Sequence, residues 1–443
     1  MKKTTKLLLP LLLAGIVVCL ALIFVNRWYS RDRHPDSAYL SLLNEAYAAV
    51  VANYVEKPDS KKLVQSMVDG MLAVLDPHSA YLPPEPYHEM EVQMSGSFGG
   101  IGIELGMKED RLIVIAPIED TPAFRAGIQA NDYIYKIDGV PTQGMNITAA
   151  VKRMRGEQGT PVTLAIMRGD SPQPRIFRLI RAIIRVKSLK SRLLEPGYGL
   201  VRITQFQERT GDEFHQALQE LRAASGGKLK GLVLDLRYNP GGLLESSVQV
   251  VNNFIGDNAA KTLIVSIRGR TPDATQNFNA TLGPKEAHYP LVVLINGGSA
   301  SASEIVAGAL QDHKRAIIMG KQSFGKGSVQ SIFPLRDNGA LKLTTARYYT
   351  PSGRSIQAKG ITPDIEVGTV WPVAAKDAAK EAELKEKDLE NRLESKGGEK
   401  DTKGGTPFPH GGSSATDVAK DYQLNRALEL LRSLELVRQR GAS

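Results

Sequence analysis

Residues 231–237 (GLVLDLR) and residues 290–296 (PLVVLIN) are the two stretches that decide the fold of this chain. Each is a short run of mostly Leu, Val and Ile, which is typical of a strand buried on both faces of a sheet. Amphipathic stretches lie near them in the sequence, at 213–224 (EFHQALQELRAA) and 301–311 (SASEIVAGALQ). Strands that alternate with helices build a largely buried sheet covered by helices, so we expect residues 198–367 to form an α/β layer.

Length and composition limit the number of domains and exclude several classes of function. The chain has 443 residues, 42% of them apolar, which is enough for about two or three domains. Its 56 Lys and Arg against 47 Asp and Glu give a formal charge of +9, too mild an excess for a dense nucleic-acid-binding patch, so no nucleic-acid partner is expected. A single cysteine excludes an intramolecular disulfide framework and a Cys-rich zinc site.

The N-terminus carries a membrane signal. Residues 7–25 are uncharged and apolar, and at 1.5 Å per residue they span about 28 Å, close to the thickness of a bilayer core. Trp28 and Tyr29 follow where interfacial aromatic residues belong. A cleaved signal peptide is the alternative, but no small-x-small site precedes Ser30. We therefore expect an inner-membrane anchor, with the body exported to the periplasmic side and its lone thiol, Cys19, inside the anchor.

The regions outside the α/β layer have different residue patterns. Residues 38–82 have apolar residues at helical spacing, and 97–180 alternate short apolar runs with turn residues, which predicts a β-rich module. Residues 374–396 are a charge-rich helix former, and a Gly/Ser/Pro-rich spacer predicted to be disordered follows them. The last stretch has an apolar stripe that needs a partner surface, formed by Leu424, Leu428, Leu431 and Leu434.

Three glycine-rich segments follow predicted strands of the α/β layer. They are residues 234–246 (LDLRYNPGGLLES), 294–305 (LINGGSASASEI) and 320–330 (GKQSFGKGSVQ). Loops at the carboxyl ends of strands are where α/β sheets hold ligands and catalytic groups. We therefore expect the three segments to converge on one site.

The middle segment offers a nucleophile. Ser299, Ser301 and Ser303 each suit a helix N-cap, which is the plain structural interpretation. Small residues around Ser301 also allow close approach of a substrate backbone, and the Ala302 amide at a helix N-terminus is placed to stabilise an oxyanion. A second donor could come from the turn after Pro240, whose glycines are Gly241 and Gly242.

Two residues compete as the base. His313, beside Asp312, suggests a Ser/His/Asp triad, but it follows a helix in a polar run typical of a solvated histidine. Ser301 also lacks the G-x-S-x-G elbow. Lys326 lies between two glycines and near Phe324, where loss of water would lower the pKa of its ammonium group and make it a competent base. A turn lysine that faces water is the alternative.

Residues 320–327 also mimic a nucleotide-binding loop. They read G-x-x-x-x-G-K-G, one residue short of the P-loop pattern. Gly327 lacks the hydroxyl that would hold Mg²⁺, and a strand-like stretch follows instead of a phosphate-binding helix. The sequence therefore argues against an NTPase.

Together these motifs resemble the carboxyl-terminal processing proteases, tail-specific serine peptidases of the S41 family that use a Ser/Lys dyad. The resemblance covers residues 40–370 and includes DPHSAYL (76–82) and GSFGGIGIEL (96–105). It implies a multidomain chain with a PDZ-like β-rich module before an α/β, ClpP/crotonase-like protease core. It also implies Ser301 as nucleophile, Lys326 as base and Gln330 as the residue that orients the lysine. The oxyanion donors would be the amides of Ala302 and of Gly241 or Gly242.

The resemblance gives the β-rich module a role as well. PDZ domains add a peptide C-terminus to a sheet edge and hold its carboxylate on backbone amides of a glycine-rich loop. Family members use an arginine of an RG motif, here Arg155-Gly156, to couple peptide capture to the active site; a plain surface arginine is the alternative. The expected peptide-binding residues are Phe98, Gly99, Gly100, Ile101, Gly102 and Ile103.

The expected domains run along the chain in the following order. They are a signal or anchor (1–30), a helical N-terminal region (36–95), a PDZ domain (96–182), a protease core (183–370), a charged helix with a disordered linker (371–418) and a C-terminal helix (419–443).

The predicted function is a serine endopeptidase that captures C-terminal tails of exported proteins and needs no metal or organic cofactor. The alternatives are a membrane-anchored PDZ scaffold or chaperone that does not cleave, and a crotonase-like acyl-CoA enzyme. Expected partners are proteins with accessible C-termini and the membrane, and the need for an adaptor lipoprotein is left open. The helical N-terminal region and the C-terminal leucine stripe predict a homo-oligomer.

Overall fold

The computed structural model describes residues 37–169, 171–256, 262–368, 384–394 and 421–441. The chain divides into two compact units, residues 1–71 and 72–443, and each is described by itself. The expected anchor at residues 7–25 lies outside the described residues. Among the helices that are described, none has the length and apolar character needed to cross a membrane.

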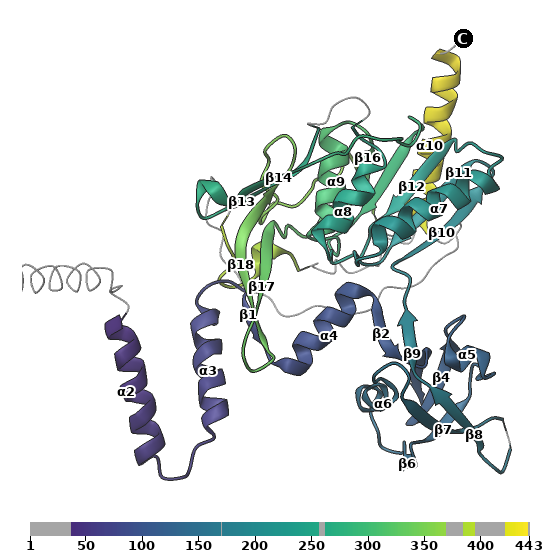
Figure 1. Ribbon diagram of the computed structural model, residues 1–443. Helices are drawn as coiled ribbons and strands as arrows, with labels where there is room; N and C mark the ends of the chain where they lie inside the picture. Colours follow the sequence, from purple (N-terminus) through teal and green to yellow (C-terminus); the bar gives the residue numbers. More distant parts are fainter. Residues whose placement is uncertain (1–36, 170, 257–261, 369–383, 395–420, 442–443) are drawn as a thin grey trace, which may run out of the picture. The chain divides into compact units, whose positions relative to one another are not determined.

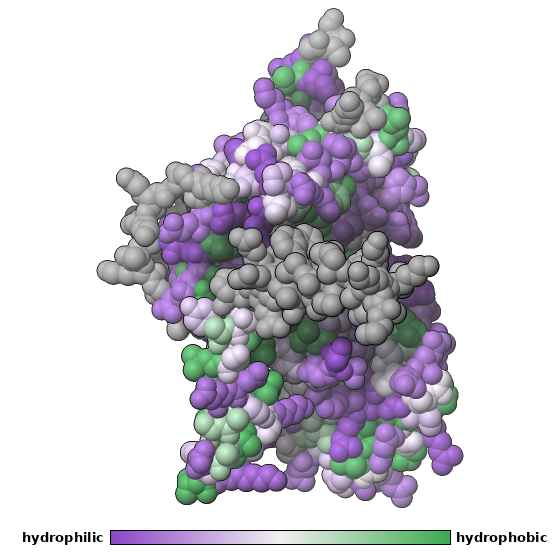
Figure 2. Space-filling model, turned by 60° about the vertical axis from the view of Figure 1, so that its left-hand side comes forward, coloured by the Kyte–Doolittle hydropathy of each residue, from purple (hydrophilic) through white to green (hydrophobic). Residues whose placement is uncertain are grey.

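The first unit contains helix α2 (Ser37–Asn53) and most of α3 (Ser60–Ala73). No residue of α2 is buried, and its large apolar side chains Tyr39, Leu40 and Leu42 are each more than half exposed. On the face of the molecule seen in Figure 2, hydrophobic side chains form small groups among hydrophilic ones. An uncovered apolar helix of this kind needs another surface to bury it.

A six-stranded sheet is the centre of the second unit (Figure 1). Its strands from β11 onward are parallel, and β10 pairs antiparallel at one edge. In spatial order the strands are β10 (Leu189–Glu195), β11 (Tyr198–Ile203), β12 (Gly231–Asp235), β15 (Leu291–Ile295), β16 (Ile317–Gly320) and β19 (Ile365–Glu366). The parallel strands rich in Val, Leu and Ile confirm the α/β layer expected from the sequence.

Helices cover both faces of this sheet (Figure 1). On β15, Val293 and Ile295 pack into the core that contains α7 (Thr210–Ala224), α8 (Leu244–Asn252) and α9 (Ala302–Asp312). The alternate residues Val292 and Leu294 pack into a second core with α10 (Tyr422–Gly441). The period of two along a strand therefore explains why both faces of β15 are apolar.

Helix α10 corrects one expectation. Leu424, Leu428 and Leu431 are at most 5% exposed because they pack on the chain's own sheet, and only Leu434 of the stripe is half-buried. The guanidinium of Arg237 also binds both carboxylate oxygens of Asp421, just before the helix. The stripe has its partner surface within the chain, so it gives no support to an oligomer built through the C-terminus.

A second sheet brings the N-terminal DPHSAYL motif to the core. Strand β1, within that motif, pairs antiparallel with β18, so Ala80 lies opposite Lys342. Strand β17 pairs with the same long strand β18. The strands are β1 (Ala80–Leu82), β18 (Ala340–Tyr349), β13 (Leu263–Gly269), β14 (Thr275–Asn279) and β17 (Ser328–Pro334), with the 3-10 helix η1 (Pro272–Ala274) next to β14.

The β-rich module has its own sheet and its own apolar core. Helix α4 (Pro84–Ser95) precedes it, and β2 (Ser97–Gly100) pairs with β9 (Ala182–Arg185) where the chain enters and leaves. The module contains β3 (Ile103–Lys108), β4 (Arg111–Pro117), α5 (Pro122–Arg125), β5 (Tyr133–Ile137), β6 (Val140–Pro141), α6 (Ile147–Met154), β7 (Pro161–Met167) and β8 (Arg175–Ile180). Because β3 is an edge strand, it can accept an added strand.

The charged segment after the core differs from its prediction. Of residues 374–396, only 384–394 are described, and they contain the 3-10 helix η3 (Glu386–Asp388) instead of an α-helix. Glu386 is completely buried and hydrogen-bonded to distant parts of the chain. Helix propensity in this stretch is overridden by these tertiary contacts.

Candidate active site

The three glycine-rich loops lie together at the carboxyl ends of β12, β15 and β16, as the sequence predicts. The Ala300 N–H donates to the Asn239 carbonyl at 3.0 Å, which joins the first two loops. The Phe324 N–H donates to the Ser299 carbonyl at 3.0 Å, which joins the second and third loops. Adjacent parallel strands end at one edge of the sheet, so the loops that follow them form one site.

The structure separates the roles of the three serines. Ser299 and Ser303 are completely buried, and their hydroxyls donate to the carbonyls of Leu236 and Asn239 at 2.8 and 3.0 Å. Ser301 is the N-cap of α9 and has a φ of +52°, a left-handed conformation that costs about 1–3 kcal/mol in a non-glycine residue. Its side chain contacts the Tyr348 hydroxyl. Of the three serines, Ser301 is therefore the one whose hydroxyl is not bound to a backbone carbonyl in the described part of the chain.

Glu304 joins the loop of Ser301 to the loop of Lys326. Its buried carboxylate accepts the N–H of Ser301 at 2.8 Å and the N–H of Lys326 at 2.9 Å. It also accepts the Gly325 N–H and the Ser323 hydroxyl. Burial raises the pKa of Glu304 to about 7, while these four donors favour its ionised form. The sequence analysis missed this role, although the S-x-x-E spacing of a capping box is its signal.

Lys326 lies in surroundings that favour its neutral form. Burial lowers the pKa of Lys326 below its ordinary value, and repulsion by Lys342 lowers it further. The carboxylates of Glu386, Glu304 and Asp76 attract the ammonium group and act in the opposite direction. A lysine with a lowered pKa holds a larger neutral fraction near neutral pH, which a general base requires.

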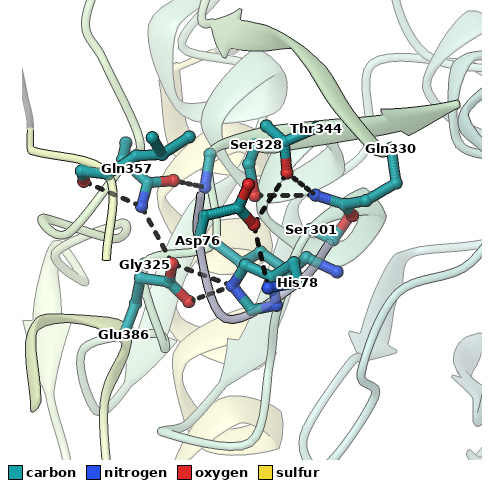
Figure 3. A network of polar contacts seen from close by, with 12 residues as sticks. Asp76, His78, Ser301, Gly325, Ser328, Gln330, Thr344, Gln357 and Glu386 are labelled. Carbon is teal, nitrogen blue, oxygen red and sulfur yellow. Dashed lines mark hydrogen bonds and ion pairs between the residues drawn. The ribbon is translucent and has the colours of Figure 1, made fainter. Parts of the chain in front are cut away.

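Gln330 makes contacts that differ from the expected one. Its side-chain amide donates to the hydroxyls of Ser328 at 3.0 Å and Thr344 at 3.2 Å (Figure 3). The Thr344 hydroxyl in turn donates to Asp76 at 3.0 Å. In the described part of the chain, Gln330 therefore links β17 to β18 and to the DPHSAYL motif, and no direct hydrogen bond joins it to Lys326.

Asp76 is a polar centre to which the sequence analysis gave no role beyond membership of the DPHSAYL motif. Its pKa is lowered although burial opposes this, because Ser79, His78 and Thr344 donate hydrogen bonds to its carboxylate. The Ser79 hydroxyl lies 2.7 Å and the His78 N–H lies 2.9 Å from its oxygens. The DPHSAYL motif thus reaches β18, the strand that pairs with β17 after Lys326.

His313 does not belong to this site. It caps the C-terminal end of α9, and Ser301 precedes the N-terminal end of the same helix. Twelve steps along the helix at about 1.5 Å each separate the two by about 18 Å. The His313 ring bonds the Leu263 carbonyl at 2.7 Å and is half-buried, so it is not the solvated histidine expected, and Asp312 pairs with Arg354. A triad of Ser301, His313 and Asp312 is excluded by this geometry.

The oxyanion candidates lie next to Ser301. A Cβ added to Gly241 would come within 2.8 Å of the Ser301 Cβ and 3.0 Å of the Ala302 nitrogen. The Gly241 N–H already donates to the Asn239 side chain at 2.9 Å. The parallel bridge between Phe206 and Gly242 uses the Gly241 carbonyl and the Leu243 N–H, and not the Gly242 amide. These contacts favour Gly242 over Gly241 as the second donor beside Ala302.

The expected peptide-binding residues fall into different environments. Phe98, Gly99 and Gly100 are in β2, paired with β9. Ile101 is 2% exposed in the module's core, and its carbonyl already accepts the Ala123 N–H at 2.9 Å. Gly102 has a φ of +77°, and Ile103 begins the edge strand β3. The glycine loop and the edge strand thus have the arrangement that strand addition needs.

Arg155 is tied to the same loop. Its guanidinium carbon lies 4.4 Å from the centre of the Phe98 ring, a cation–π contact. The Gly156 N–H donates to the Gly99 carbonyl at 3.1 Å. Arg155 is therefore not a free surface arginine, because it packs on the residue that opens the glycine loop.

The comparisons with known proteins agree with this geometry. A model of peptidase family S41 matches residues 197–367, and a PDZ domain model matches residues 99–174. A "Carboxy-terminal-processing protease" of Bartonella bacilliformis is 44% identical over 424 residues, 95% of this chain and 94% of the relative. This chain belongs to peptidase family S41. It is a serine-type peptidase whose PDZ domain precedes the protease domain.

Other S41 peptidases extend the comparison. A "Probable CtpA-like serine protease" of Staphylococcus aureus is 37% identical over 361 residues, 81% of this chain and 71% of the relative. The solved structure of a photosystem II D1 C-terminal processing protease is 30% identical, covers 74% of this chain and 92% of its own, and has a TM-score of 0.42. Because the chain belongs to a peptidase family, the two alternatives considered from the sequence, an acyl-CoA enzyme and a scaffold that does not cleave, are not supported.

Proposed function

We propose that this S41 peptidase captures the C-terminal tails of exported proteins on its PDZ domain and cleaves them with a Ser301/Lys326 dyad. The name of the relative from Bartonella bacilliformis supports a carboxy-terminal substrate. The edge strand β3 beside a glycine loop supports capture by strand addition. The observation that carries the dyad is the carboxylate of Glu304, which binds the backbone N–H of both residues.

The chemistry is acyl transfer in two steps. Neutral Lys326 takes the hydroxyl proton of Ser301, and the serine oxygen attacks the peptide carbonyl carbon. The amides of Ala302 and Gly242 hold the oxyanion, and the protonated lysine gives its proton to the departing amine. Water then attacks the acyl-enzyme and gives a proton to Lys326, and Lys326 passes this proton to the serine oxygen as the ester bond breaks, which releases the acid and restores Ser301.

Gln330 assists in this scheme by fixing the strand that follows the lysine. Its amide binds Ser328 and Thr344, so it holds β17 against β18 three residues beyond Gly327. Orientation of Lys326 then comes from the backbone rather than from a direct contact. Removal of the Gln330 amide is expected to slow turnover less than removal of Lys326.

The setting of the enzyme is part of the same proposal. Residues 7–25 would anchor the chain in the inner membrane with the body on the periplasmic side. The uncovered apolar side chains of α2 support a homo-oligomer built through the N-terminal helices. An adaptor lipoprotein that delivers substrates would be a further partner. Light scattering at micromolar concentration tests the oligomer, and a monomer there would contradict it.

The direct test uses purified full-length chain and a loosely folded protein that ends in apolar residues. Wild type should shorten it from the C-terminal side, with fragments identified by mass spectrometry, while Ser301→Ala and Lys326→Ala should not. A matched substrate with a charged tail should be cleaved more slowly because it binds the PDZ domain less well. Turnover by Ser301→Ala comparable to that of wild type would contradict the role of Ser301 as the nucleophile.

A further inference from the structure

Residues 384–394, here named the strap, lie beyond the match to the S41 model yet contact the loop that carries Lys326. The Glu386 N–H donates to the Phe324 carbonyl at 3.2 Å. The Lys385 ammonium donates to the Gln322 side chain at 3.1 Å. The strap therefore packs on the residues directly before the proposed base.

The Glu386 carboxylate is the centre of these contacts. It is completely buried, and Gln357 donates to it at 2.9 Å (Figure 3). The His78 ring nitrogen lies 2.8 Å from its second oxygen. A buried carboxylate is costly unless polar partners compensate it, so these two side chains explain how Glu386 is tolerated in the interior.

Gln357 connects the Glu386 carboxylate to the backbone next to Lys326. Its side-chain oxygen accepts the Gly327 N–H at 3.0 Å, and its amide nitrogen also donates to the Leu393 carbonyl at 3.1 Å. The backbones are also close together, because a Cβ added to Gly327 would lie 2.3 Å from the backbone nitrogen of Gln357. The Lys326 N–H is held by Glu304 and the next N–H is held by Gln357, so both peptide groups around the base are fixed.

We propose that Glu386 is a positioning residue for Lys326: through Gln357 it holds the peptide after the lysine, and the strap thereby completes the protease site from outside the S41 domain. The inference rests on the proposed role of Lys326 as the base. Glu386 does not act on substrate in this scheme. Its effect is on where the lysine amine lies and on the charge that surrounds it.

The negative charge of Glu386 should have a measurable effect on how activity depends on pH. The charged groups that face Lys326 are Lys342, Glu386, Glu304 and Asp76, and Glu386 is the first of the three that favour the ammonium form. Glu386→Gln removes that attraction but keeps an oxygen that can accept the Gln357 amide. The pKa of Lys326 should then fall, and the rise of kcat/KM with pH should move to lower pH.

Glu386→Ala removes both the charge and the hydrogen bond to Gln357. The Gln357 side chain, which accepts the Gly327 N–H, is then held less firmly, and a displacement of about 1 Å at a reacting group reduces turnover by up to about 100-fold. The loss should fall on kcat, while KM stays near that of wild type, because neither Glu386 nor Gln357 belongs to the PDZ domain.

The experiment measures kcat and KM against pH for the full-length chain on the substrate described above. Glu390 lies on the same strap and is exposed, so Glu390→Gln and Glu390→Ala are matched controls. We expect wild-type kinetics in both controls, an acid shift in Glu386→Gln and a lower kcat in Glu386→Ala. Wild-type kcat and an unshifted profile in the Glu386 variants would overturn the inference.

Two further arms keep the result decisive. If Glu386→Ala does not fold, judged by its circular dichroism, then Glu386→Gln decides alone, and an unmoved profile in that variant overturns the inference. Ser301→Ala and Lys326→Ala test the proposed function in the same assay. If these are inactive while both Glu386 variants behave as wild type, only the inference fails; turnover that survives them overturns the dyad and the inference with it.

Discussion

The loop of Ser301 and the loop of Lys326 meet in one site, but they are held in place in different ways. Ser301 owes its position largely to its own neighbourhood: the strand β15 before it, the helix α9 after it, and Glu304 three residues along the chain. Lys326 is held by Glu304 and by Gln357, which depends on Glu386. The proposed nucleophile is thus positioned mainly by its own segment and the proposed base by tertiary contacts, and the following experiments test this contrast.

The largest effect is expected from Lys326→Met. Turnover should fall by about four orders of magnitude or more, because the variant has no base. The pKa of Lys326 is lowered in the fold, so the stability linked to this group is fully present above the unfolded pKa and is lost as pH falls through the folded pKa. At pH 7 the variant should therefore unfold at a higher temperature than wild type.

Thermal unfolding at pH 7 and pH 10 checks this second expectation. The advantage of Lys326→Met should shrink at pH 10, where the wild-type lysine is increasingly neutral in both states. Lys314→Met, at the exposed end of α9, is the control and should change neither activity nor stability. A Lys326→Met variant less stable than wild type at pH 7 would contradict the desolvation argument.

Glu304→Gln should have the next largest effect, because it disturbs both loops at once. Each carboxylate oxygen accepts two of the four donors, so two of them then meet an amide NH₂ group instead of an oxygen. Loss of a buried partner costs about 1–3 kcal/mol, so the free energy of unfolding should fall by at least that amount and kcat should fall with it. Denaturant titration and kinetics measure the two changes, and Glu220→Gln on the exposed face of α7 is the matched control. Wild-type values for both would show that Glu304 does not join the loops.

Lys342→Gln changes the base without touching the nucleophile. Lys342 repels the Lys326 ammonium group, so its removal should raise the pKa of Lys326. The rise of kcat/KM with pH should move to higher pH, opposite in sign to the shift expected for Glu386→Gln. Lys314→Gln is the control. A shift to lower pH would mean that Lys342 influences the profile by another route.

Tyr348→Phe should have the smallest effect of the four. Burial raises the pKa of Tyr348 to about 12, so its hydroxyl stays protonated and can orient the Ser301 side chain but not deprotonate it. Loss of one hydrogen bond worth about 0.5–1.5 kcal/mol predicts at most about a tenfold lower kcat with an unchanged pH profile. Tyr349→Phe is the control on the neighbouring residue. A loss above 100-fold or a moved profile would give Tyr348 a direct part in proton transfer.

Much of the site was predictable because its signals are local. Apolar runs identify β12 and β15, glycine-rich loops follow them, and a serine at a helix start marks Ser301. The capping-box spacing could also have identified Glu304. Periodicity and capping depend on residues within one or two turns, so a single sequence contains them.

The contacts that fix Lys326 were not predictable in the same way. Glu386 lies in a charge-rich stretch whose helix propensity gives no sign of burial, and His78 is 308 positions away from it. The leucine stripe of α10 likewise predicted a covered face without saying which surface covers it. Pairing of buried polar and apolar groups depends on which distant segments come together.

The sequence alone indicated most strands and helices of the protease core, its three glycine-rich loops and the residue types able to perform acyl transfer. The tertiary structure alone decided that α10 covers the chain's own sheet, that Gln330 binds Ser328 and Thr344, and that the strap reaches the loop of Lys326. Secondary structure follows from short-range patterns, whereas the environment of a buried amine is made by groups that only the completed fold brings within a few ångströms.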